Sequence, residues 1–372
     1  MTTGLAMGLP EARRNEAASL FRARGLPTRR VEEWKYSDLA RALGETGFGV
    51  AAAQWVIGPL PQGVELFDLS KNDAPDWVRA HLGAQVPNAL SAASLASARG
   101  GVALRVRGAA DAPLALEFLG AGQVRALIVL EEGASLTLLE RQGDAAPSRN
   151  VGLEIVLGAG AALAHVRIAP SMPGVTVEQI ALSLAQGARY DAHFAGFGAK
   201  LSRLELNIAL DGKKAEANLS GVCVLGGDAH ADVTTHIRHN VGATHSSQLF
   251  KHVAGGKSHA VYQGKVTVAP HADGSDSTQS AKALLLGAQA EADLKPELEI
   301  LADDVKCAHG AAVGDLDAES LFYLRARGIP EDEARAMLIH AFLEDAVSLI
   351  ANEDVRAQVR AAVDAALDEV SA

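Results

Sequence analysis

Residues 133–140 read GASLTLLE, residues 160–167 read GAALAHVR and residues 187–194 read GARYDAHF. The three stretches recur at a constant interval, and each places an alternating apolar run after a Gly-Ala pair. Alternation with a period of two is typical of a strand with one buried face. A fixed spacing in this range indicates a solenoid, whose coils bury their inner faces by stacking on one another. We therefore predict a mainly β fold, a parallel β-helix with glycine at its corners.

A second series of glycines supports the same fold. Gly212, Gly227, Gly242 and Gly256 recur at intervals of 15, 15 and 14, and alternating runs such as 230–237 and 259–268 follow them. From about Gly101 to residue 312 helix signals are absent. Roughly 200 residues at about 25–30 per coil predict about seven or eight coils, stacked about 4.8 Å apart. We expect Gly133, Gly160 and Gly187 to occupy equivalent corners.

The competing fold is an antiparallel sandwich. Asp-Gly pairs are typical of the tight turns of β-hairpins, and the chain contains two of them, Asp211-Gly212 and Asp273-Gly274. The sequence by itself leaves this alternative open.

The sequence pattern changes from helical signals to alternating strand runs and back again, which predicts three regions. They are a mostly helical N-terminal region at 1–99, the β-helix at 100–312 and a helical C-terminal domain at 313–372. We predict a helix from residue 10 that Gly25 and Pro27 end, and a second helix at 31–43. Short strands near 64–69 and a helix at 77–81 follow. In the motif EEWKYS at 32–37, an amphipathic helix would dock Trp34 on the core.

The C-terminal region begins with Asp317, which can cap a helix at 318–326. A second helix is expected at 331–350, and Asn352 can cap a third. The expected apolar stripe of the second helix is Met337, Leu338, Ala341 and Phe342, extended by Ala346, Leu349 and Ile350. From residue 315 onward the chain has 13 acidic and 5 basic residues, a net charge of −8. This region could close the open end of the solenoid as a polar cap, dock a basic partner, or do both.

Composition excludes several classes of protein. The 372 residues include 48% hydrophobic but only 4% aromatic residues, and the net charge is −11. This charge argues against nucleic-acid binding through a strong basic field. Two cysteines do not make a disulfide framework, no apolar run reaches the length of a membrane span, and the first residues do not read as a signal peptide. We therefore expect a soluble, cytoplasmic protein.

One candidate site stands at the end of the strand-rich region, where residues 298–314 read LEILADDVKCAHGAAVG. Cys307 and His309 are two positions apart, so in a strand they point to the same face. Sulfur and imidazole nitrogen are soft or borderline metal ligands, but two ligands do not close a tetrahedral site. A metal here would need ligands from elsewhere, most simply from another chain. The alternative is a buried cysteine beside a solvated histidine.

Seven of the twelve histidines fall between His230 and His271. They lack metal-ligand spacing: the intervals from His245 to His252 and from His252 to His259 are odd, which places consecutive members on opposite faces of a strand. We expect solvated histidines on the outer face of the solenoid, with a subset facing a partner as the alternative.

Several stretches together resemble the SufB/SufD family of iron–sulfur cluster assembly proteins. They are DDVKCAHGA at 303–311, KPELEI at 295–300, FYLRARGI at 322–329, His239-Asn240, SQLFK at 247–251 and EEWKYS at 32–37. The resemblance is close over about 230–350 and weaker before that. With only two cysteines, the chain is less similar to the SufB branch. The resemblance implies a right-handed parallel β-helix flanked by helical ends.

The resemblance also implies a function and partners. It implies a non-catalytic scaffold in a complex with a SufB paralogue and the ATPase SufC, in which His309, with Cys307 beside it, faces SufB and helps to hold a transient Fe–S cluster. It implies that the C-terminal helices bind SufC, and we expect the contact around Phe322, Tyr323, Leu324, Arg325, Arg327, Gly328, Met337 and Phe342. No cofactor is expected on this chain alone, a flavin is expected at most in the complex, and a homodimer is possible when the chain is isolated. The alternative function is a β-helix enzyme acting on polysaccharides, which needs paired carboxylates on the outer face.

Overall fold

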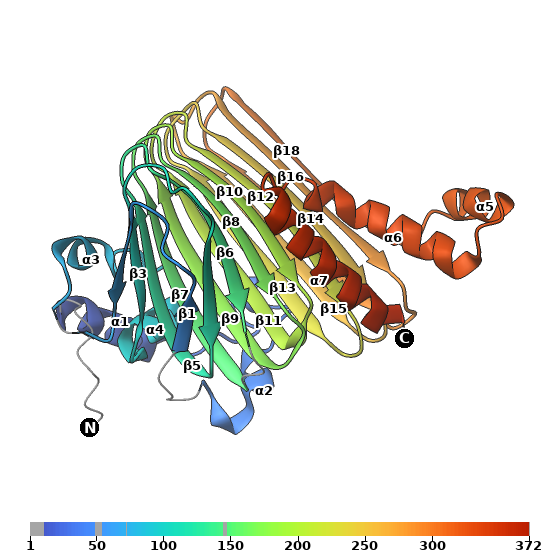
Figure 1. Cartoon of the computed structure of the whole chain (residues 1–372), viewed down its shortest axis with the longest axis horizontal. Helices are drawn as coiled ribbons and strands as arrows, with labels where there is room; N and C mark the ends of the chain where they lie inside the picture. Colours follow the sequence, from blue (N-terminus) through green and yellow to red (C-terminus); the bar gives the residue numbers. More distant parts are fainter. Residues whose placement is uncertain (1–10, 49–53, 72, 144–146, 372) are drawn as a thin grey trace.

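The computed structural model describes residues 11–48, 54–71, 73–143 and 147–371. The body of the protein is a parallel β-solenoid of about eight coils, in which each coil gives one strand to each of two nine-stranded sheets (Figure 1). Sheet A contains β2 (Val64–Asp68), β3 (Gly101–Val106), β5 (Gly122–Leu130), β7 (Ser148–Leu157), β9 (Met172–Leu184), β11 (Ala199–Leu210), β13 (His230–His239), β15 (His259–Val268) and β17 (Glu291–Ile300). Sheet B contains β1 (Gln54–Ile57), β4 (Leu114–Leu119), β6 (Ser135–Gln142), β8 (Ala162–Ala169), β10 (Arg189–Gly196), β12 (Glu216–Leu225), β14 (His245–Ala254), β16 (Ser275–Leu285) and β18 (Val305–Gly314).

The strands of successive coils pair in parallel from β3 to β18, which confirms the β-helix and shows that the antiparallel sandwich is wrong. Among the described strands, only β1 and β2 pair antiparallel, with β4 and β3. Both lie in the N-terminal region, which therefore contributes two strands to the sheets as well as helices. The inside of the solenoid is filled mainly by Val, Leu, Ile and Ala, as alternation with one buried face requires.

The repeat that begins at Gly133 forms a column of corners. Gly133, Gly160 and Gly187 all have positive φ, between 64° and 67°, and each donates its backbone N–H to a carbonyl of the next coil. Lys214 and Ala243 continue the column with φ of 62° and 55°. The second glycine series alternates between the two ends of the coils, because each of its intervals is half of a coil. The expected equivalence of the three glycines is confirmed.

A polar network interrupts the apolar interior. His165 contacts the Tyr190 hydroxyl through Nδ1 at 2.9 Å and Glu140 through Nε2 at 3.1 Å. Arg167 donates to Glu178 at 2.6 Å. Burial raises the pKa of Glu178 to about 8 and lowers the pKa of His165 to about 4. Desolvation disfavours the charged form of each group, so burial favours the protonated form of Glu178 and the neutral form of His165.

The N-terminal helices cover the outer face of sheet A. They are α1 (Glu11–Arg24), α2 (Leu39–Leu43), α3 (Asp76–His81) and α4 (Ala89–Ser97). The first ends just before Gly25, as predicted, but the second predicted helix is wrong: a 3₁₀ turn at Glu32–Trp34 is separated from α2 because Asp38 caps the new helix. Trp34 is nevertheless buried, against Leu39, Leu90 and other apolar groups.

Three helices form the C-terminal region: α5 (Ala318–Ala326), α6 (Glu331–Val347) and α7 (Glu353–Ser371). Asp317 and Asn352 accept the expected capping hydrogen bonds from Ser320 and Val355. Helices α6 and α7 pack across the outer face of sheet B, on the side opposite the N-terminal helices (Figure 1). Our interpretation of this region as a cap over the open end is therefore wrong.

The apolar stripe of α6 also differs from the prediction. Its buried residues are Ala334, Ile339, Leu343, Ala346 and Val347, whereas Met337, Ala341 and Leu349 are exposed. The apolar outer face of sheet B selects the side of the helix that is buried, and the helix sequence offers more than one apolar side. Within the part of the chain that the structure describes, no helix is both long and apolar enough to cross a membrane.

Candidate functional site

The last coil of the solenoid, β17 and β18, is its exposed end. Each strand pairs on one edge only, β17 with β15 and β18 with β16, and most residues of β18 are exposed. The other edge of each strand presents backbone N–H and C=O groups that no further coil uses. Unpaired strand edges are sites where another chain can add.

Cys307 and His309 lie on this last strand and share one face, as predicted. In the parallel register Cys307 pairs with Ser277 and His309 pairs with Gln279. Ser277 and Gln279 are both buried, and Cys307 packs on the interior apolar cluster. The pair therefore stands at the rim of the solenoid interior, with Cys307 half-buried and His309 exposed.

The surroundings of Cys307 do not favour its thiolate form. Burial and the nearby Asp276 carboxylate raise the pKa of the Cys307 thiol, against the opposing backbone N–H of Ser277. Lys306 pairs with Asp276 in the register and, as the neighbour of Cys307 in a strand, points to the other face. Lys306 therefore does not favour a thiolate in the isolated chain. A thiolate would need a metal or a positive group from a partner.

Polar groups behind the pair were not predicted from the sequence. Neither amide atom of Gln279 has a hydrogen-bond partner, and Gln248 Nε2 and both ring nitrogens of His252 also lack one among the described residues. Gln248, Gln279 and His309 follow one another in register across β14, β16 and β18. Successive members of this column are one coil apart in the sequence, so the coil repeat is the signal that could have located it.

The histidine-rich segment is only partly on the surface. His239 and His252 are buried inside, and His239 uses its two ring nitrogens with Thr244 at 2.7 Å and Ser246 at 2.9 Å. Burial lowers the pKa of His239 and of His252 to about 4. Our interpretation of all seven as solvated outer histidines is therefore wrong for these two. No group of three or more His, Cys, Asp or Glu among the described residues could hold a metal ion.

The residues expected to contact a partner are mostly on α5 and the adjoining end of α6, which project away from the two sheets (Figure 1). Phe322 is 74% exposed, Tyr323 57% and Met337 46%. Arg327 stacks on the Tyr323 ring and donates to its hydroxyl at 3.0 Å, which stiffens α5. Leu324 and Gly328 accompany them on this segment, and Arg325 pairs with Glu331 at 3.2 Å.

Phe342 has a different environment from the other residues in this set. It is half-buried on sheet B, and the Lys251 ammonium lies 4.3 Å from the centroid of its ring. Lys251 is itself buried and bonds Asp345 at 2.7 Å. The Phe342 side chain therefore anchors α6 to the solenoid.

Comparison with known proteins gives one family. The model for "SUF system FeS cluster assembly, SufBD core domain" matches residues 118–342, more than half of the chain. Iron-sulfur cluster assembly protein SufD of Escherichia coli is 34% identical over 63% of this chain and 56% of its own length. The SufBD family protein slr0076 of Synechocystis is 29% identical over 98% of this chain and 92% of its length.

A third relative is the chloroplastic protein ABCI7 of Arabidopsis thaliana, which is 31% identical over 63% of this chain and 51% of its own length. The match thus spans only about half the length of the E. coli and Arabidopsis relatives. The family-model match includes Cys307, His309 and the whole of α5, so the candidate site lies inside the shared region.

Proposed function

The chain belongs to the SufBD family of SUF-system iron–sulfur cluster assembly proteins, and we propose that it is a non-catalytic scaffold subunit. In this proposal the nascent Fe–S cluster is cargo, held between this chain and a SufB paralogue. The names of the relatives indicate an assembly role rather than an enzyme. We extend this assignment to a site and to two partners.

The observation that carries the proposal is the position of Cys307 and His309 at the open end of the solenoid. The pair offers one sulfur and one nitrogen on a strand with a free edge. A second β-helix that docks on this edge would continue the backbone ladder and bring its own side chains to the same rim. The missing ligands of an iron site would then come from the partner, because two ligands are too few for a closed site.

Helix α5 supports the second partner, the ATPase SufC. It exposes two large aromatic side chains, Phe322 and Tyr323, on a projecting segment. Exposed aromatic side chains grouped in this way are typical of interface anchors. The net charge of −8 from residue 315 onward favours a partner with a basic face.

The test is co-expression with the SufB and SufC paralogues, followed by anaerobic iron and sulfide analysis of the purified complex. We expect His309→Ala to lower cluster yield without loss of either partner, and Cys307→Ser to have a smaller effect. Lys306→Ala is the matched control, because it alters the same strand on the opposite face. Normal cluster yield from the His309→Ala complex would contradict the proposed site, and a chain that binds neither paralogue would contradict the scaffold role.

A further inference from the structure

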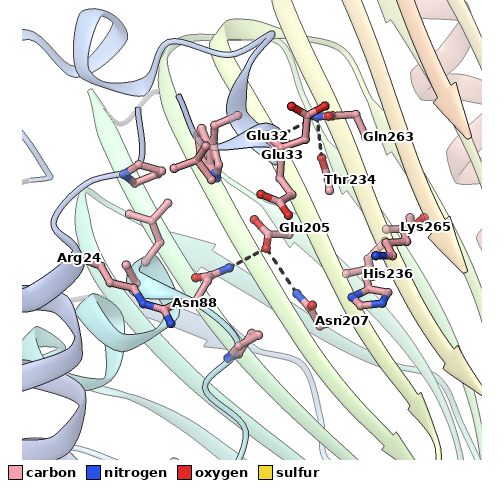
Figure 2. A pocket seen from close by; sticks show the side chains of 18 of the residues that line it. Arg24, Glu32, Glu33, Asn88, Glu205, Asn207, Thr234, His236, Gln263 and Lys265 are labelled. Carbon is pink, nitrogen blue, oxygen red and sulfur yellow. Dashed lines mark hydrogen bonds between the residues drawn. The ribbon is translucent and has the colours of Figure 1, made fainter. Parts of the chain in front are cut away.

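A pocket of about 370 Å³ lies on the outer face of sheet A and extends as far as β17 in the last coil. Its walls come from three parts of the chain: residues 24–34 of the N-terminal segment, residues 87–90 at the start of α4, and strands β11, β13, β15 and β17 (Figure 2). The volume is in the range of small-molecule sites in proteins, which are about 300–1,000 Å³. Two stretches that carry the family resemblance, residues 32–37 and 295–300, contribute to its lining, but neither the proposed cluster site nor the proposed SufC contact uses the pocket.

Two of the three lysine and arginine side chains in the lining already have acidic partners, and the third is Arg24. Lys295 bonds Glu32 at 2.6 Å and Glu297 at 2.9 Å, and Lys265 bonds Glu299 at 2.7 Å. A phosphate or carboxylate ligand would have to compete with these acids. The two lysines are therefore a poor match for the phosphate of a flavin, and we assign no flavin to the pocket.

Two glutamate carboxylates in the pocket do not contact these lysines. Glu33 and Glu205 both project into it (Figure 2), and no described residue forms an ion pair with Glu33. Glu205 is half-buried, accepts a hydrogen bond from the Asn88 amide at 2.6 Å, and forms an ion pair with the buried Arg203 at 3.5 Å. Glu33 is exposed and lacks an ion pair among the described residues, so a ligand that brings a positive donor would supply its missing partner.

The remaining wall is apolar and preformed. Trp34 and Leu90 are buried in the lining, and Pro27 and Pro87 fix the two loop segments that border it. The side chain of Gln263 donates to the Glu33 carbonyl at 2.9 Å, so the segment that carries Glu33 is tied to β15. An apolar wall beside these carboxylates suits an organic cation rather than a hydrated metal ion.

We propose that this pocket binds a small organic cation, a molecule with a protonated amine or a guanidinium on an aliphatic stem, with its positive group between Glu33 and Glu205. The stem lies along Trp34 and the two prolines. Binding joins the N-terminal segment to sheet A, so the ligand stabilises their contact.

The test uses agmatine as the probe and N-butylurea as its uncharged counterpart, with binding to the full chain followed by calorimetry and by the shift in melting temperature. We expect saturable agmatine binding by the wild type and none by N-butylurea. Glu33→Gln and Glu205→Gln should each weaken agmatine binding about tenfold or more, since each removes one charged acceptor. Glu132→Gln is the control: it removes the same charge from an exposed turn outside the pocket.

Three results would overturn the proposal: no saturable agmatine binding by the wild type, equal binding by all three variants, or unchanged binding by either pocket variant. Equal binding would show a general attraction of cations to a chain with a net charge of −11. The assay needs no paralogue and no cluster, so its outcome is independent of the scaffold role.

Discussion

The guanidinium carbon of Arg203 lies 4.0 Å from the centroid of the Trp34 ring, and both side chains are buried. Arg203 on β11 also donates to Asp232 on β13, which accepts a hydrogen bond from the Ser37 hydroxyl at 2.5 Å. The segment that contains Trp34 and Ser37 is thus fixed to the outer face of sheet A by a buried charge and the ring stacked on it. Breaking up such a buried pair leaves an uncompensated charge, which is strongly destabilising.

The first prediction is that Trp34→Ala releases this segment while the solenoid remains folded. Truncating a buried Trp removes about 3–5 kcal/mol of packing, and only local contacts of the segment depend on it. We expect amide hydrogen exchange in residues 28–43 to become about a hundredfold faster or more. Arg30→Ala, at an exposed position of the same segment, should leave exchange unchanged. Undiminished protection in Trp34→Ala would show that the ring is dispensable for docking.

The second prediction concerns the column of corners. Ala243 has a φ of 55°, a left-handed backbone conformation. This conformation costs about 1 kcal/mol for a residue with a Cβ, and glycine adopts it without this steric cost. Ala243→Gly should therefore raise the free energy of unfolding by up to about 1 kcal/mol in urea titrations. The reverse change at an equivalent corner, Gly133→Ala, should lower it by a similar amount. Destabilisation by Ala243→Gly would mean that the Ala243 methyl packs well enough to outweigh its backbone strain.

The third prediction is a pH dependence that arises inside the solenoid. The pKa of Glu178 is raised to about 8 in the fold, against 4.5 for an ordinary glutamate, chiefly by burial. The folded state therefore holds this proton more tightly, and its stability is complete below about pH 4.5 and falls as the pH rises through 8. The slope from one such group is at most about 1.4 kcal/mol per pH unit.

Glu178→Gln should flatten this dependence between pH 5 and 8, because an amide keeps a neutral group in place and does not titrate. The measurement is the free energy of unfolding at several pH values for the variant and the wild type. Glu132→Gln, an exposed change of the same kind, should retain the wild-type profile. Identical profiles for all three proteins would show that Glu178 is not protonated in the folded chain.

The fourth prediction concerns α5 and the ATPase. Deleting residues 315–372 is a poor test, because α6 and α7 cover Val222, Val224 and other apolar residues of sheet B. The double change Phe322→Ala with Tyr323→Ala is cleaner, since both rings are exposed. We expect it to leave melting unchanged and to weaken SufC binding at least tenfold in a pull-down titration. Leu349→Ala, an exposed apolar change away from α5, is the control, and full SufC binding by the double variant would rule out this surface.

The sequence by itself determined the features that depend on neighbours along the chain. The constant spacing of the Gly-Ala stretches located the corners, because left-handed backbone at Gly133, Gly160 and Gly187 is a local property of glycine. Asp317 was identified as a cap because its side chain bonds the nearby backbone N–H of Ser320. Cys307 and His309 share a face because strand geometry has a period of two.

Only the tertiary structure decided which faces are covered. It placed α6 and α7 on sheet B instead of over the open end, buried His239 and His252 inside, and joined Trp34 to Arg203. These outcomes depend on contacts between residues that are far apart in the chain. Periodicity shows that a helix or strand has an apolar face, but the surface that this face meets is set by packing between coils and helices.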